Sequence, residues 1–237
     1  MTEQPHPAAA TGRARAQAAD WALYFVTDTA MAGGVDGVCA QVAEAIHGGA
    51  HVIQVRDKHL DDAAFTDLAR RVQGVAAEVG AEHGREILVI VNDRVQIARE
   101  LGLDVHVGQS DVPAADVRAL LGPGAIVGLS VSTPAELEAA IAEGAADVVG
   151  IGPIWVTDTK TDTGDAVGLD ALARLTARAH EASLVAVAIG GIGIRNAADV
   201  AATGVDGICV VSAIALADDP ALAATFLRRQ FVMHQPL

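Results

Sequence analysis

The chain alternates between short runs rich in β-branched residues and longer Ala-rich amphipathic runs, and this alternation constrains the fold more than any other feature. Near-continuous apolar strands joined by helical crossovers predict a parallel sheet covered by helices on both faces. The expected strands are residues 23–27, 52–56, 87–91, 105–107, 126–130, 148–151, 184–189 and 207–211. The expected helices are residues 37–47, 63–79, 94–101, 114–121, 134–143, 169–179, 197–202 and 221–231.

Repetition of this unit along the chain predicts an α/β fold of the TIM-barrel type, a closed parallel (β/α)8 barrel that forms one catalytic domain over residues 21–233. The alternative is a doubly wound open sheet, which more naturally has a Gly-rich turn after its first strand. The first expected strand ends instead in Thr27 and Asp28, which favours the barrel. Residues 1–20 are interpreted as a disordered or loosely ordered tail.

Composition excludes several classes of partner. The net charge of −14 argues against binding to nucleic acid or to an anionic membrane, since both need a basic surface. No apolar run approaches the roughly 20 residues of a membrane span, and the start of the chain lacks the apolar segment of a secretory signal. Cys39 and Cys209 have no metal-ligand spacing, which predicts reduced thiols in a cytoplasmic protein.

The active site of such a barrel lies at the carboxyl ends of the strands. At the end of the second strand, alternation places Gln54, Arg56 and Lys58 on one face, with Asp57 pointing away from them. Two cations on an apolar strand either pair with surface carboxylates or meet an anionic ligand. Lys160, after the sixth strand, adds a third cation, and Arg and Lys both suit phosphate recognition.

Two carboxylates, Asp93 and Asp111, follow adjacent strands. Mg²⁺ prefers one or two carboxylates together with water and phosphate oxygens, so the pair could hold this ion beside a diphosphate. The competing interpretation is that each aspartate caps the helix that follows it. The residue types alone leave both readings open.

A second anion site is indicated where the last two strands end. Gly190 and Gly191 follow the seventh strand, and Val211 and Ser212 follow the eighth. Glycines let the backbone approach an anion, and this is a recurrent phosphate site in barrels of this type. The alternative for the glycines is a tight turn.

The remaining polar groups at this rim suit uncharged or second ligands. Ser130 and Gln54 can hydrogen-bond a ring, whereas Thr157 and Thr159 lie on a long loop that can hold another ligand. His106 is interpreted as a packed, hydrogen-bonded histidine. No Ser-His-Asp or Cys-His arrangement has a recognisable context.

The ordered set of strand ends resembles the thiamine-phosphate synthase family from about Leu23 to Phe231. The motifs that carry the resemblance are Gln54-Val55-Arg56-Asp57-Lys58, Val91-Asn92-Asp93-Arg94, His106-Val107-Gly108-Gln109-Ser110-Asp111, Gly128-Leu129-Ser130, Thr157-Asp158-Thr159-Lys160, Ile189-Gly190-Gly191-Ile192 and Val211-Ser212-Ala213-Ile214. Asp57 departs from the family, which usually has Glu there.

The resemblance implies a transferase that joins a hydroxymethylpyrimidine diphosphate to a thiazole phosphate, with Mg²⁺ as cofactor. It implies that Asp93 and Asp111 bind the metal, and that Arg56, Lys58, Ser130 and Lys160 take part in catalysis. The pyrimidine diphosphate would be held by Gln54, Val55, Arg56, Asp57, Lys58, Asn92, Ser130 and Lys160. The thiazole phosphate would be held by Thr157, Asp158, Thr159, Gly191, Val211 and Ser212.

Two alternative functions fit parts of the same pattern. A thiazole phosphate tautomerase of the same fold would need the phosphate loop but not the diphosphate and Mg²⁺ residues. A non-catalytic sensor of a phosphate ligand would bind without dependence on Mg²⁺. The sequence leaves the preferred thiazole form open, and also whether the chain forms a homo-oligomer.

Overall fold

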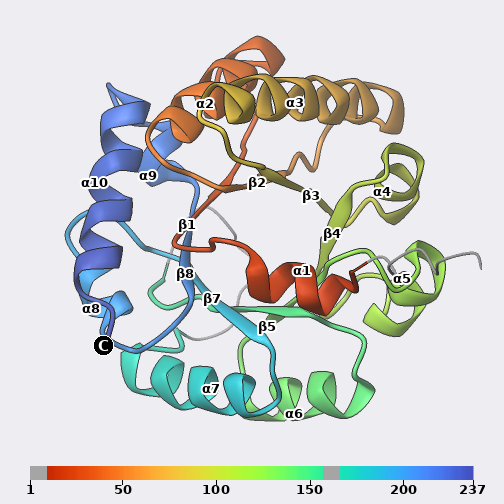
Figure 1. Cartoon of the computed structure of the whole chain (residues 1–237), viewed down its shortest axis with the longest axis vertical. Coiled ribbons are helices and arrows are strands. Elements are labelled where there is room, and N and C mark those ends of the chain that lie inside the picture. Colours follow the sequence, from red (N-terminus) through yellow and green to blue (C-terminus); the bar gives the residue numbers. More distant parts are fainter. Residues whose placement is uncertain (1–9, 157–165, 237) are drawn as a thin grey trace, which may run out of the picture.

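The computed structural model describes residues 10–156 and 166–236. Eight parallel strands close into one barrel in the order β1 to β8, each paired with its sequence neighbours and β8 paired with β1 (Figure 1). This confirms the predicted barrel. The strands are β1 (Leu23–Val26), β2 (Val52–Val55), β3 (Leu88–Asn92), β4 (Asp104–Val107), β5 (Val127–Val131), β6 (Val148–Ile151), β7 (Val185–Ile189) and β8 (Gly207–Val210).

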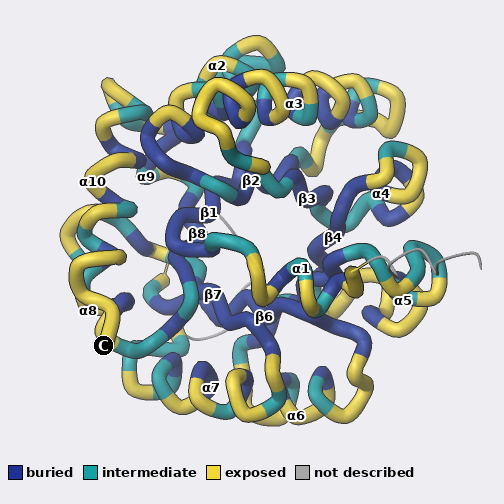
Figure 2. The backbone as a smooth tube through the Cα atoms, viewed as in Figure 1, coloured by how far each residue is buried: buried dark blue, intermediate teal, exposed yellow. Residues whose placement is uncertain are grey.

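Helices surround the strands, with their outer faces exposed and the strands buried (Figure 2). They are α1 (Gly12–Ala18), α2 (Val35–His47), α3 (Asp62–Glu82), α4 (Val95–Leu101), α5 (Ala114–Leu121), α6 (Pro134–Glu143), α7 (Leu169–Glu181), α8 (Ala197–Ala201), α9 (Ser212–Ala215) and α10 (Pro220–Met233). Of these, α1 and the single turn α9 were not predicted. At the start of α6, the side chains of Thr133 and Glu136 form a reciprocal capping box.

The strands divide the core into two layers because successive side chains point to opposite faces of a sheet. The outer cluster, between strands and helices, includes Phe25, Ile53 and Val55. The inner cluster, inside the barrel, includes Tyr24 and Val52. Both layers are almost fully buried, so the barrel interior is a packed core below the rim rather than a pore.

The N-terminal segment was predicted to be a loose tail, but its described part forms the helix α1, so the prediction is wrong for residues 12–18. Thr11 caps α1, and the helix lies across the barrel (Figure 1). Arg13 forms a salt bridge with Asp147, and Arg15 forms one with Asp104. Both aspartates are buried near the amino ends of strands, where an unpaired charge would be costly. The helix is therefore held by charges that lie far away in the sequence.

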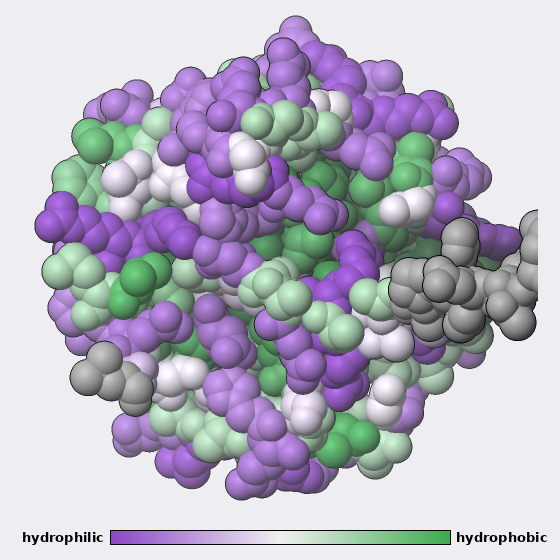
Figure 3. All heavy atoms as spheres, viewed as in Figure 1, coloured by the Kyte–Doolittle hydropathy of each residue, from purple (hydrophilic) through white to green (hydrophobic). Residues whose placement is uncertain are grey.

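The surface seen in Figure 3 is mostly hydrophilic, with apolar residues in small patches. Among the helices of residues 10–156 and 166–236, none is both long and apolar enough to cross a membrane. Cys39 and Cys209 are both free thiols, as expected.

Candidate active site at the carboxyl ends of the strands

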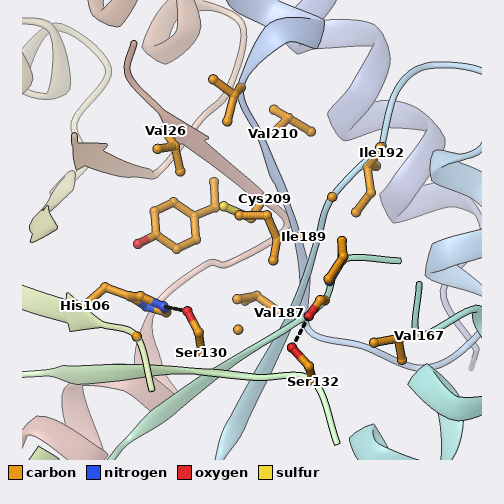
Figure 4. A pocket seen from close by; sticks show the side chains of 18 of the residues that line it. Val26, His106, Ser130, Ser132, Val167, Val187, Ile189, Ile192, Cys209 and Val210 are labelled. Carbon is orange, nitrogen blue, oxygen red and sulfur yellow. Dashed lines mark hydrogen bonds between the residues drawn. The ribbon is translucent and has the colours of Figure 1, made fainter. Parts of the chain in front are cut away.

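A cavity of about 1280 Å³ opens where the strands end, and residues from several strand ends line it. Val26, Val187, Ile189 and Cys209 form an apolar floor, and His106 and Ser130 lie to one side of it (Figure 4). Ligand pockets commonly measure roughly 300–1,000 Å³, so the cavity has room for two small ligands bound together.

The second strand presents its polar face to this cavity, as alternation predicts. Gln54, Arg56 and Lys58 all line it. Gln54 is buried, and its Nε2 donates to the Tyr24 hydroxyl at 2.6 Å. The Thr27 hydroxyl accepts from the backbone N–H of Arg56 at 3.0 Å, which fixes the strand end.

The competing interpretation pairs Arg56 and Lys58 with surface carboxylates. Within residues 10–156 and 166–236, neither cation forms a salt bridge with a carboxylate. Every arginine in those salt bridges lies elsewhere in the chain. Both side chains line the cavity and bring positive charge to it, and Lys58 acts there on the carboxylate of Asp93.

Two predicted site residues of this strand lie outside the cavity. The side chain of Val55 is fully buried in the outer core layer, so its side chain faces the helices rather than a ligand. The Asp57 carboxylate accepts from the backbone N–H groups of His59 and Leu60, both at 2.7 Å. It stabilises the turn that follows β2, and this placement agrees with the expectation that Asp57 points away from the cations.

Asp93 and Asp111 are brought together at the rim, and both line the cavity with Asn92. Burial, and then the Asp111 carboxyl group beside it, raise the pKa of Asp93 to about 6, while Lys58 opposes the increase. Asp93 also has a left-handed backbone, with φ of 58°. Such strain in a non-Gly residue is found most often where function requires it.

The helix-cap interpretation of these aspartates is wrong. The N-cap of α4 is Arg94 and that of α5 is Pro113, and neither helix start has a side-chain cap. Asp111 instead accepts from the backbone N–H of Gly108 at 2.7 Å. A divalent cation would offset the repulsion between the carboxylates of Asp93 and Asp111, and Mg²⁺ prefers hard oxygen ligands such as these. The residues present therefore fit this ion.

The loop after β7 has the backbone that the glycines predicted. Gly190 and Gly191 have φ of 103° and 69°, and a Cβ on Gly191 would lie 2.8 Å from that of Trp155. Asn196 holds the loop: its Oδ1 accepts from Gly193 N–H at 2.8 Å and its Nδ2 donates to the Gly191 carbonyl at 2.9 Å. Gly191, Val211 and Ser212 all line the cavity.

Ser130 lies deeper in the cavity, on β5. Its hydroxyl is 3.0 Å from Nε2 of His106, which is buried and hydrogen-bonded as expected (Figure 4). Gly128 and Gly150 flank the imidazole, and a Cβ on either would lie within 3.0 Å of it. The histidine is thus held in place and in turn positions the serine.

Sequence reasoning did not single out Tyr24, Ser132, Arg195 and Asn196 as site residues, although all four line the cavity. Tyr24 is the second residue of β1 and lies below the strand end, so only the pairing of β1 with β2 shows that it supports Gln54. Asn196 follows the glycines by a short interval and could have been found as a loop-closing side chain. Thr157, Asp158, Thr159 and Lys160 lie outside the described residues.

Comparison with known proteins gives the same family from three directions. A family model described as thiamine monophosphate synthase matches residues 23–214. A thiamine-phosphate synthase of Laribacter hongkongensis is 43% identical over 203 residues, covering 85% of this chain and 91% of that protein. The solved structure of a thiamine phosphate pyrophosphorylase from Pyrococcus furiosus superimposes with a TM-score of 0.78 at 30% identity, covering 92% of this chain and 98% of that one.

A longer relative shows the same region as part of a larger protein. The thiamine biosynthesis multifunctional protein ThiED of Corynebacterium efficiens is 43% identical over 211 residues, which are 86% of this chain but 28% of that protein. The chain thus spans little more than a quarter of that relative. The family model, the 43% identity to the Laribacter hongkongensis protein and the shared barrel lead to one conclusion: the chain belongs to the thiamine monophosphate synthase family.

Proposed function

We propose that the chain is a thiamine-phosphate synthase. It couples 4-amino-2-methyl-5-(diphosphooxymethyl)pyrimidine with 4-methyl-5-(2-phosphooxyethyl)thiazole, or its carboxylated form, and releases thiamine phosphate and diphosphate. The observation that carries the proposal is the set of charged side chains that line the cavity at the carboxyl ends of the strands. Arg56 and Lys58, which form no salt bridge with a described residue, line the same cavity as the carboxylate pair of Asp93 and Asp111, and this cavity has room for two ligands.

The diphosphate of the pyrimidine substrate binds to Arg56, Lys58 and Asn92. An arginine can hold two phosphate oxygens at once, and a lysine acts as a mobile point charge. Lys160 is part of this proposal from the sequence. These groups stabilise the negative charge that builds on the leaving group as the C–O bond breaks.

Asp93 and Asp111 would hold Mg²⁺ at the same end of the cavity. When bound, the ion neutralises charge on the diphosphate and so makes it a better leaving group. The raised pKa of Asp93 supports this assignment, because it reflects burial and the neighbouring Asp111 carboxyl group, and a cation bound between the two carboxylates would offset their repulsion.

The two rings lie on the apolar floor and meet there. Ser130, positioned by His106, hydrogen-bonds the pyrimidine, and Gln54, positioned by Tyr24, contributes a second polar contact. The C–O bond breaks, its electron pair leaves with diphosphate, and the amino-pyrimidine supports the methylene cation. The thiazole nitrogen then forms the new C–N bond. No protein nucleophile is required, and the protein contributes alignment of the two ligands.

The thiazole phosphate binds at Gly191, Val211 and Ser212. The positive φ of Gly191 leaves its backbone open to an anion, and Asn196 holds the loop in that shape. Thr157, Asp158 and Thr159 complete the thiazole side in this proposal. The free thiols of Cys39 and Cys209 support a cytoplasmic location.

The proposal is tested by incubating the purified protein with both substrates and Mg²⁺ and measuring thiamine phosphate and diphosphate. We expect both products in equal amounts, and neither when EDTA replaces Mg²⁺. Binding of both substrates without product would support the sensor alternative. Conversion of thiazole phosphate alone, independent of Mg²⁺, would support the tautomerase; either result would overturn the proposal.

A further inference from the structure

A second group of metal-ligating side chains lies away from the cavity, where α2 and α3 end. His47 is the last residue of α2, Glu82 is the last residue of α3, and His83 is its C-cap. One ligand atom from each lies within 4.8 Å of the others, and all three residues are exposed. The two helices pack side by side (Figure 1). None of the three residues lines the cavity at the rim.

The two imidazoles already face each other through their nitrogen atoms. His47 Nδ1 lies 3.0 Å from His83 Nε2, and the rings meet edge to face with an interplanar angle of 74°. A tetrahedral zinc ion with Zn–N bonds of about 2.0–2.1 Å separates two nitrogen ligands by about 3.3 Å. The pair therefore needs to open by only a few tenths of an ångström to hold such an ion.

The backbone that carries these side chains is fixed on both helices. A Cβ on Gly48, which follows His47, would lie 2.4 Å from the Ala221 carbonyl oxygen, so the end of α2 packs closely against α10. At the end of α3, the N–H groups of His83 and Arg85 both donate to the Gly80 carbonyl, at 3.1 and 3.0 Å. Rigid supports reduce the entropy lost when a ligand binds.

The local charge also favours a cation. Both helices end at the cluster, and the carboxyl end of a helix carries partial negative charge. Glu82 adds a full negative charge. The neighbouring cation Arg85 is engaged elsewhere, with its guanidinium 2.6 Å from His51 Nε2 and 3.2 Å from the Ile46 carbonyl.

We propose that His47, Glu82 and His83 form a second metal site, which takes Zn²⁺ or a similar imidazole-preferring divalent ion and ties the end of α2 to the end of α3. Two imidazoles, one carboxylate and a water are a coordination that Zn²⁺ adopts in proteins. The two sites therefore differ in the metal that they prefer, because imidazole ligands suit Zn²⁺ whereas Mg²⁺ favours the oxygen ligands of the carboxylate pair at the rim.

The site is tested by titrating ZnCl2 into the full chain by calorimetry, in the presence of saturating Mg²⁺ so that the oxygen site is filled. We expect one Zn²⁺ per chain, with affinity reduced more than tenfold in His47→Gln and in His83→Gln, and to a lesser extent in Glu82→Gln. The matched control is His234→Gln, an exposed histidine at the end of α10, which should titrate as the wild type does.

Stability provides the second readout. At a free Zn²⁺ concentration about 100 times the dissociation constant, the ratio of folded to unfolded wild-type protein should rise about 100-fold, because only the folded chain brings the ligands together. His83→Gln should show no such rise and should keep wild-type turnover. Absence of Zn²⁺ binding to the wild type, or unchanged affinity in both histidine variants, would overturn the proposal.

Discussion

Two pairs of aspartates occupy opposite ends of the barrel. The closed end is where α1 lies across the amino ends of the strands (Figure 1), and the open end is where the cavity lies. The surroundings of the two pairs differ completely. At the closed end, Asp104 accepts from Arg15 at 2.8 and 3.0 Å and from the N–H of Ile126 at 2.7 Å. Asp147 has Arg13 and Arg118 as partners and accepts from the N–H of Val127 at 3.1 Å. Each of these carboxylates is neutralised within the protein.

At the open end, Asp93 and Asp111 are next to each other instead. The pKa of Asp93 is raised to about 6 because of burial and the neighbouring carboxyl group. An aspartate thus has a structural role where arginines neutralise it. Where its neighbour is another carboxylate, its charge is left to be neutralised by a ligand. The comparison teaches that the role of an aspartate at a strand end follows from its partners in space and not from its position in the chain.

The largest effect is expected at the open end. Asp93→Asn should lower turnover by about 10²–10³-fold and weaken the dependence on Mg²⁺, since an electrostatic contribution to leaving-group stabilisation is lost. Steady-state kinetics across a range of Mg²⁺ concentrations measures both changes. Wild-type kinetics in this variant would show that Asp93 does not take part in catalysis, and would contradict the functional difference between the two pairs.

The converse substitution, Asp147→Asn at the closed end, should act on stability. The substitution leaves the charges of Arg13 and Arg118 without their shared carboxylate. Breaking a buried ion pair costs more than breaking an exposed one. Because both arginines are partly exposed, we expect a loss of only about 2–3 kcal/mol in the free energy of unfolding. Urea unfolding measures it, and turnover per folded molecule should change little. Glu138→Gln, which breaks an exposed ion pair with Arg178, is the control and should have no measurable effect.

The smallest effect is a gain in stability from Asp93→Asn in the metal-free protein. Because the folded pKa of about 6 lies above the unfolded value of about 3.9, ionisation of Asp93 destabilises the fold as the pH rises from about 4 to 6. With allowance for partial exposure, the variant should be more stable by about 1–2 kcal/mol at pH 8 and equal near pH 4. Urea unfolding in EDTA at the two pH values tests this; a variant less stable than wild type at pH 8 would contradict it.

Local pattern was enough to predict most of the barrel. The strand and helix positions agree with those expected to within a few residues, because each strand is buried on both faces and each helix on one, and this periodicity is written in the sequence. The α1 helix was missed because it is short and depends on Asp104 and Asp147, which lie far along the chain.

The sequence by itself determined which side chains of β2 face inward, since the period of a strand is two: Gln54, Arg56 and Lys58 line the cavity, while Val55 does not. It also placed Asp93 and Asp111 at the correct end of the barrel. Only the tertiary structure decided that these aspartates meet as a pair and cap no helix, because that depends on the distance between two separate strands. Local propensity describes neighbours in the chain, whereas a charge responds to its neighbours in space.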